Sequence, residues 1–324
     1  MSHDRIHDRI DVHAHYVPDF YRSALEAAGH SRPDGIKAIP EWSEDLALRA
    51  MDELGVRTAL LSISSPGVYF GDADAAVALA RQVNEEGARL VRAHPGRFGF
   101  FASLPLPDVA AAEDELRYAL DVLHADGIVL ETNHAGVYLG DERLEPLYAE
   151  AARRGAVVFV HPTTPAGGEH LALGYPRPML EFMFETTRSV TDLILSGVLD
   201  RHPDLKVIVP HAGAALPVLA GRVELLLPLL APAGGPGLPS VRKALRRLHF
   251  DLAGAPVPEL LDALLKVADP GHLHYGSDFP FTPLAPAVEL ADTLSHTPSL
   301  ESSARAAMFR CNALDLLPRL RDGS

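Results

Sequence analysis

The sequence predicts an α/β protein built as a (β/α)8 TIM barrel. Short β-branched or aromatic runs recur along the whole chain, each is followed by a longer Ala/Leu-rich segment with helical spacing, and eight such units can be counted. A chain of 324 residues, 47% of them hydrophobic, is long and apolar enough to bury the core of such a barrel. A doubly wound open sheet is the alternative that the same alternation allows.

The eight runs are predicted strands, and the stretches between them leave room for one crossover helix each. The runs begin at Ile10, Thr58, Phe98, Gly127, Val157, Lys206, His249 and Leu273. Among the intervening segments, "SEDLALRAMDELG" predicts a helix with clear ends. Ser43 is the expected N-cap, two acidic residues occupy the first turn, and Gly55 marks the C-terminal stop.

We expect one domain over residues 1–324. Three connections are too long or too rich in proline and glycine to be simple loops, at about 16–43, 165–178 and 228–240. The first two follow the first and fifth strands. In a barrel they would lie over the C-terminal face and could form the wall of a pocket there.

Bulk composition excludes several classes of partner. The net charge of −14 argues against binding to nucleic acid or to an anionic membrane, because both need basic patches. The chain contains no apolar run long enough to span a bilayer, and its N-terminus is charged where a secretion signal would be apolar. The one cysteine, Cys311, cannot form an internal disulfide. These features predict a cytoplasmic protein.

The first predicted strand carries two histidines, His13 and His15, in the stretch "IDVHAHYVP". Strict alternation along a strand would place Asp11, His13 and His15 on one face and Val12 and Ala14 on the other. In a barrel the first face would point inward, where two imidazoles within roughly 7 Å of each other can bind one metal ion. Two ordinary core histidines are the alternative interpretation.

Other strand ends carry further residues of the metal-ligand type. His161 ends the fifth predicted strand, His211 ends the sixth, and Asp278 ends the eighth. If consecutive strands are neighbours around the barrel, four histidines and one carboxylate surround one point at its C-terminal mouth. Zn²⁺ suits this ligand set most simply, and Mn²⁺ is possible. A second HxH pair, His272 and His274, stands at the start of the last strand and is assigned to structure.

Several other residues near the strand ends are candidates for substrate contact or support. His134 follows the fourth strand and could contact a substrate. The aromatic residues Tyr16 and Phe281 could form the walls of a site for a flat apolar ring. Asp251 is either functional or a satisfied structural group, and Asp11 is expected to hydrogen-bond a ligand histidine or the backbone. The chain has no GxSxG, P-loop or GxGxxG motif.

The stretches "IDVHAHYVPDFY", "FVHPTTP", "VIVPHAGAALP" and "YGSDFPFT" resemble the amidohydrolase superfamily, and more narrowly the aminocarboxymuconate-semialdehyde decarboxylase group. The resemblance extends over nearly the full length. Within that group the combination of "YVPDFY", "SISSPGVYFGD" and "NHAGVYLGD" is most similar to the 6-methylsalicylate decarboxylases. The resemblance implies a TIM barrel of the metal-dependent amidohydrolase type.

The resemblance also implies roles for individual residues. The metal ligands are matched by His13, His15, His161 and Asp278. His211 matches a histidine that acts in acid/base chemistry. Arg222 matches an arginine that reaches the substrate carboxylate of a neighbouring subunit, which implies a homodimer, and Arg49 matches another carboxylate-binding arginine. Relatives often have glycine or glutamate where this chain has Ala214, so the resemblance does not explain the orientation of His211.

The predicted function is metal-dependent, non-oxidative decarboxylation of a small aromatic acid with an ortho hydroxyl, such as 6-methylsalicylate. The ion would act as a Lewis acid on the carboxylate and phenolate oxygens, and Asp278, or else His211, would protonate the ring carbon. Asp278 would have to loosen from the ion to do so. Hydrolysis of an amide, ester or lactone by metal-activated water, with His211 as base, is the alternative. A non-catalytic binding protein is a third reading, which predicts a degraded ligand set.

Overall fold

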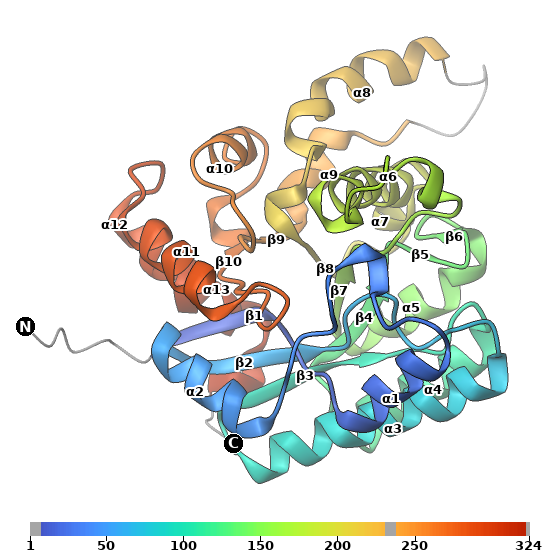
Figure 1. Cartoon of the computed structure of the whole chain (residues 1–324). Coiled ribbons are helices and arrows are strands. Elements are labelled where there is room, and N and C mark those ends of the chain that lie inside the picture. Colours follow the sequence, from blue (N-terminus) through green and yellow to red (C-terminus); the bar gives the residue numbers. More distant parts are fainter. Residues whose placement is uncertain (1–7, 231–237, 322–324) are drawn as a thin grey trace, which may run out of the picture.

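The computed structural model describes residues 8–230 and 238–321, and its centre is a barrel of eight parallel strands (Figure 1). The strands of the barrel are β1 (Arg9–His15), β2 (Val56–Ser62), β3 (Phe98–Ser103), β4 (Gly127–Glu131), β7 (Val157–His161), β8 (Lys206–Val209), β9 (His249–Asp251) and β10 (Leu273–His274). A two-stranded antiparallel ribbon of β5 (Asn133–His134) and β6 (Val137–Tyr138) follows β4. All eight predicted strands are confirmed.

Closure of the sheet decides between a barrel and an open sheet. The strands are hydrogen-bonded in sequence order from β1 to β10. The first strand then meets the segment that follows the last one. Val12 N donates to Tyr275 O at 3.0 Å, His15 N donates to Phe279 O at 2.8 Å, and Ala14 forms a parallel bridge with Phe279. The predicted (β/α)8 barrel is therefore confirmed.

Helices surround the strands (Figure 1). They are α1 (Asp19–Ala27), α2 (Glu44–Leu54), α3 (Ala73–Ala93), α4 (Val109–Asp121), α5 (Glu145–Arg154), α6 (Glu181–Leu195), α7 (Val198–Arg201), α8 (Leu216–Leu230), α9 (Val241–Arg247), α10 (Glu259–Leu264), α11 (Leu284–His296), α12 (Ser302–Ala306) and α13 (Asn312–Leu316). In α2 the Ser43 side chain accepts from Leu46 N, and Gly55 ends the helix in the left-handed conformation, as predicted. Among the described residues, no helix is long and apolar enough to cross a bilayer.

The first strand departs from the alternation expected of it. Its register with β2 shifts between Asp11 and Ala14. Ile10 and Val12 pack in the barrel interior with Phe159, while the His13 ring also contacts the Phe159 ring at 4.9 Å between centroids. The expected sharing of one face by Asp11, His13 and His15, with Val12 on the other, is therefore wrong.

Asp11 instead lies on the side of the strand that faces α2, beside Ala14 and Met51. Its Oδ1 accepts from His13 N at 3.0 Å and from Ser277 N at 3.1 Å. These hydrogen bonds hold the irregular segment to the end of the last strand. The irregularity lets two successive side chains, Val12 and His13, reach the interior.

The long connections lie where the site is built. Segment 16–43 contains α1 and a short 3-10 turn, Pro33–Gly35, and segment 165–178 contains the turn Gly168–His170 and the start of the turn Arg177–Met179. The side chain of Thr164, the residue that precedes the second segment, donates to Asp34 in the first. The expected segment 228–240 lies partly outside the described residues, since 231–237 are not among them. The expectation of one domain stays a prediction.

Candidate metal centre and active site

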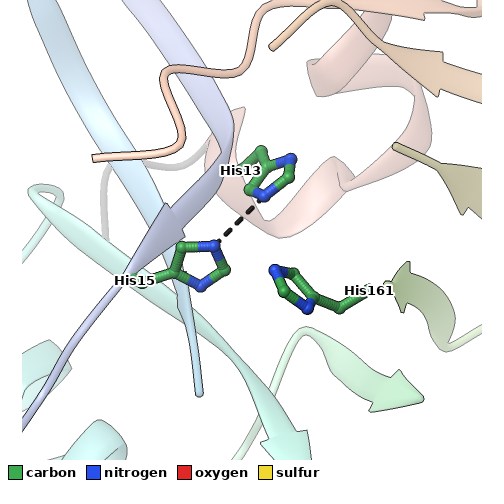
Figure 2. A group of neighbouring side chains, drawn as sticks. All are labelled: His13, His15 and His161. Carbon is green, nitrogen blue, oxygen red and sulfur yellow. Dashed lines mark hydrogen bonds between the residues drawn. The ribbon is translucent and has the colours of Figure 1, made fainter. Parts of the chain in front are cut away.

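Three histidines from two strands converge inside the mouth of the barrel. His13 and His15 come from β1, and His161 comes from the end of β7, on the opposite side of the mouth (Figure 2). One ring nitrogen of each lies within 4.8 Å of the others, and all three side chains are buried. His13 Nε2 and His15 Nε2 are 3.1 Å apart. Converging imidazole nitrogens of this kind are the donor set of a divalent metal.

The other nitrogen of each ring lies close to a buried oxygen. The Nδ1 contacts are Asp251 Oδ2 at 2.9 Å from His13, Ser62 O at 3.1 Å from His15, and Glu131 Oε2 at 3.4 Å from His161. An acceptor at Nδ1 favours the tautomer that leaves Nε2 free to bind a cation. The residues present thus fit a divalent metal ion, both in donor type and in ring orientation.

Asp278 adds a carboxylate to the histidines. Its Oδ1 lies 3.2 Å from His15 Nε2 and 3.5 Å from His13 Nε2, while Oδ2 accepts from Thr282 Oγ1 at 2.9 Å. Its φ of 57° is in the left-handed region, and its N donates to His13 O at 2.7 Å. Burial raises the pKa of Asp278, but the hydrogen bond with His15 and the charge of His13 outweigh burial and lower the pKa to about 2.

The three histidines differ in pKa because their electrostatic surroundings differ. Burial lowers the pKa of His15 and, more strongly, that of His161, so both rings are neutral, which is the form that binds metal. Burial also opposes protonation of His13, but the Asp251 carboxylate outweighs it and raises the pKa of His13 to about 9. Since a ligand ring must be unprotonated, cation binding there would release a proton.

His211 approaches the cluster from the turn after β8. Its ring centroid is 5.2 Å from that of His13, and its Nδ1 is buried with no partner among the described residues. Burial lowers the pKa of the His211 ring. The turn has positive φ at His211, Ala212 and Ala214, and Asp251 Oδ1 accepts from His211 N at 3.0 Å. Asp251, rather than a residue at position 214, therefore holds His211 beside the cluster.

A cavity of ≈ 680 Å³ opens beside these groups. His161, His211 and Asp278 line it, together with Ser64 and with apolar residues from the loops over the mouth and from the first turns of α6 and α10: Ile36, Pro178, Met179, Phe182, Met183, Leu260, Pro280 and Phe281. Its volume suits a small aromatic ligand. Among the described residues, Lys37 is the one lysine or arginine that lines it.

The structure does not bring all predicted contact residues to this cavity. Tyr16 is fully buried in the core, where its hydroxyl donates to Val83 O at 2.8 Å. Arg49 is exposed on α2, and Arg222 is exposed on α8; neither lines the cavity. His134 lines a different cavity, of ≈ 620 Å³. Phe281 is the one predicted aromatic contact at the site, and its ring meets that of His15 at 5.4 Å.

Sequence reasoning missed Lys37 and Glu131. Lys37 lies inside the long segment 16–43 that was expected over the mouth, so a basic residue in that segment was an available signal. Glu131 is the last residue of β4. Its position matches those of the histidines at the ends of other strands, but only the structure shows which neighbour its carboxyl contacts.

Comparisons with known proteins agree with this geometry. The chain matches the amidohydrolase family over residues 10–319. It is 40% identical over 321 residues to the 6-methylsalicylic acid decarboxylase of Aspergillus aculeatus, with 97% of both chains covered. It is 38% identical over 317 residues to the 6-methylsalicylic acid decarboxylase of Penicillium expansum, again with 97% of both covered. A crystal structure of an amidohydrolase II, 34% identical, superposes with a TM-score of 0.89 over 96% of this chain and 99% of that one.

Proposed function

The chain belongs to the amidohydrolase family, and we propose that it is a metal-dependent carboxy-lyase that releases CO2 from a small aromatic acid with an ortho hydroxyl, of the 6-methylsalicylate type. The observation that carries the proposal is the 40% identity to a 6-methylsalicylic acid decarboxylase over 97% of both chains. The buried histidine cluster beside an apolar cavity supplies the site that this reaction needs. The reaction exchanges a ring carboxylate for a proton.

The metal would be held by His13, His15, His161 and Asp278, with Zn²⁺ as the proposed ion and Mn²⁺ as the alternative. When bound, it supplies Lewis-acid stabilisation of negative charge on the substrate oxygens. Asp251 and Ser62 O keep the rings of His13 and His15 oriented. Lys37, which is exposed and lines the cavity, contributes a positive charge that favours an anionic substrate.

Proton delivery falls to Asp278 or His211, because both line the cavity. The bond between the ring carbon and the carboxylate breaks, CO2 leaves, and a proton from the acid forms the new C–H bond; solvent or the phenol then restores the acid. Asp278 is held as a carboxylate by His13 and His15, so it must loosen from them to carry the proton. His211, whose Nδ1 has no hydrogen-bond partner in the described part of the chain, is the second candidate.

We also propose a homodimer in which Arg222 reaches the substrate of the neighbouring subunit. Helix α8 extends from the body of the barrel (Figure 1). It carries exposed apolar residues. Val218, Leu225 and Leu229 are 65%, 67% and 71% exposed and share one helical face with Arg222. An apolar stripe of this size is typical of a buried interface. A cytoplasmic location stays the prediction from composition.

The test is to incubate the purified, metal-loaded protein with 6-methylsalicylate and to measure CO2 and 3-methylphenol. We expect both products in equal amounts, and we expect chelation of the metal to abolish them. Cleavage of a lactone, ester or amide panel without CO2 release from any hydroxybenzoate would show hydrolysis instead. Light scattering on the wild type and on Leu225→Glu tests the dimer, which the variant should dissociate.

A further inference from the structure

Glu131 is a buried carboxyl that has no lysine or arginine partner in the part of the chain that the structure describes. Its side chain is 6% exposed at the end of β4, and among the described residues the only hydrogen-bond contact of its carboxyl is with His161. Three other buried acids, Glu115, Asp126 and Glu185, each pair with an arginine. Burying a carboxyl without such a partner is unfavourable, so its position calls for a reason beyond packing.

The sheet places Glu131 directly beside His161. The two residues are register partners in the β4–β7 pair, and Glu131 Oε2 lies 3.4 Å from His161 Nδ1. The other nitrogen, Nε2, lies 3.4 Å from Ser64 Oγ, which lines the catalytic cavity. Nδ1 is thus directed toward Glu131, and Nε2 toward the site.

We propose that Glu131 is a positioning residue that orients His161 so that Nε2 is presented to the metal, an inference that rests on the metal site proposed above. It is the counterpart, on the far side of the mouth, of Asp251 at His13. The acceptor is a carboxyl oxygen, which remains available whether or not the group carries a proton. Carboxyl groups behind ligand histidines strengthen metal binding by restricting the ring and its tautomer.

Removal of this acceptor should therefore weaken metal binding without unfolding the barrel. Glu131 also lines the cavity of ≈ 620 Å³ that contains His134, so a side chain of similar size can be accommodated. Glu131→Leu removes the acceptor, whereas Glu131→Gln retains one acceptor oxygen. Glu185→Gln changes a fully buried carboxyl that contacts Asn133 and Arg188 rather than a cluster histidine, and it serves as the control.

The experiment measures the Zn²⁺ dissociation constant by chelator competition, the absorption spectrum of the Co²⁺-substituted protein, and the Tm of the metal-free protein. For Glu131→Leu we expect Zn²⁺ affinity to fall about 10- to 100-fold. The Co²⁺ spectrum should change, with a metal-free Tm close to that of the wild type. Glu131→Gln should recover part of the affinity, and Glu185→Gln should bind Zn²⁺ like the wild type.

Two results would overturn the inference. In the first, Glu131→Leu binds Zn²⁺ within twofold of the wild type. In the second, the Zn²⁺ affinity of Glu131→Leu falls only in proportion to its loss of metal-free Tm, and Glu131→Gln restores neither the affinity nor the Tm. That result would make Glu131 purely structural. A wild type that binds no divalent metal would remove the metal site and this inference together. A wild type that binds metal but releases no CO2 would refute only the decarboxylase proposal.

Discussion

The two ends of the barrel each hold a cluster of three histidines, and the two clusters differ in what surrounds the rings. At the mouth, His13, His15 and His161 each direct Nδ1 at a carboxyl or carbonyl oxygen. At the opposite end, the rings of His249, His272 and His274 contact one another. His249 Nδ1 lies 2.9 Å from His274 Nε2, and the rings of His249 and His272 are 4.2 Å apart.

None of the three rings at the strand starts is hydrogen-bonded to a carboxylate among the described residues. Nδ1 of His272 and Nδ1 of His274 are buried and have no hydrogen-bond partner within residues 8–230 and 238–321. Burial lowers the pKa of His274 to about 3 and, with the charge of His274, lowers that of His249 to about 2. An HxH spacing on a strand therefore does not by itself make a metal site. The oxygen acceptors that orient the rings, and the nearby Asp278, distinguish the mouth.

The largest expected difference in the rate of CO2 release comes from replacing one histidine by asparagine at each end of the barrel. His15→Asn removes a proposed metal ligand, and we expect CO2 release to fall about a thousandfold or more, since Lewis-acid stabilisation contributes several kcal/mol. His272→Asn should change the rate less than about twofold, because catalysis does not use that ring. Steady-state CO2 release from both variants measures the contrast, and similar losses in the two would contradict the proposed location of the site.

Asp251→Asn tests whether the carboxylate behind His13 at the mouth contributes to metal binding. The variant loses the charge beside His13 but keeps the shape of the side chain. We expect Zn²⁺ affinity to fall about 10- to 100-fold by chelator competition. His274→Gln is the matched change at the other end and should leave Zn²⁺ affinity unaltered. Equal affinity in Asp251→Asn and the wild type would mean that the carboxylate does not support the metal site.

A lysine stands near each end, which permits a third comparison. Lys37 lines the catalytic cavity, whereas Lys206 Nζ donates to Leu316 O at 3.2 Å near the strand starts. Lys37→Met should raise the KM for the aromatic acid about tenfold, because a charge-assisted contact is lost. Lys206→Met should lower Tm while leaving KM unchanged. A KM that depends on Lys206 rather than Lys37 would argue for a different mode of substrate binding.

The last prediction concerns stability rather than turnover, namely the pH dependence of the free energy of unfolding that His274 contributes at the strand starts. His274 stays neutral in the folded protein down to about pH 3, whereas the unfolded chain protonates it below its ordinary pKa of 6.5. The unfolded state thus binds more protons in that window, and the free energy of unfolding falls as pH decreases, by about 1.4 kcal/mol per pH unit per histidine. Urea titrations at several pH values between about 6 and about 4 give the free energy of unfolding at each pH. We expect this free energy to fall less steeply with decreasing pH in His274→Gln than in the wild type. An unchanged slope would contradict the neutral, buried state of the ring.

Much of this molecule follows from local sequence patterns. Hydrophobic runs and their spacing predicted all eight strands of the barrel, and Ser43 and Gly55 predicted the ends of α2. Because consecutive parallel strands are neighbours in a barrel, chain order alone also predicted that His161 would face His13 and His15. These are properties of repeat order and of short-range chemistry.

Other features depend on contacts between distant segments. Alternation placed Asp11 with His13, but a register shift against β2 changes the face on which Val12 and Asp11 lie. Tyr16 follows the first strand closely, yet its hydroxyl finds Val83 O in the core. Register and hydroxyl partners are set by the neighbouring strand and helix, and neither is visible in a local pattern.

The sequence by itself determined the barrel, the order of its strands and the identity of the groups that stand at their C-terminal ends. Only the tertiary structure decided that oxygens of Asp251, Ser62 and Glu131 lie beside Nδ1 of the three rings, that Lys37 rather than Arg49 lines the cavity, and that His134 belongs to a different one. The physical reason is that strand formation depends on residues close together in the chain. Ring orientation and cavity lining depend on atoms within a few ångströms in space, supplied by segments far apart in the chain.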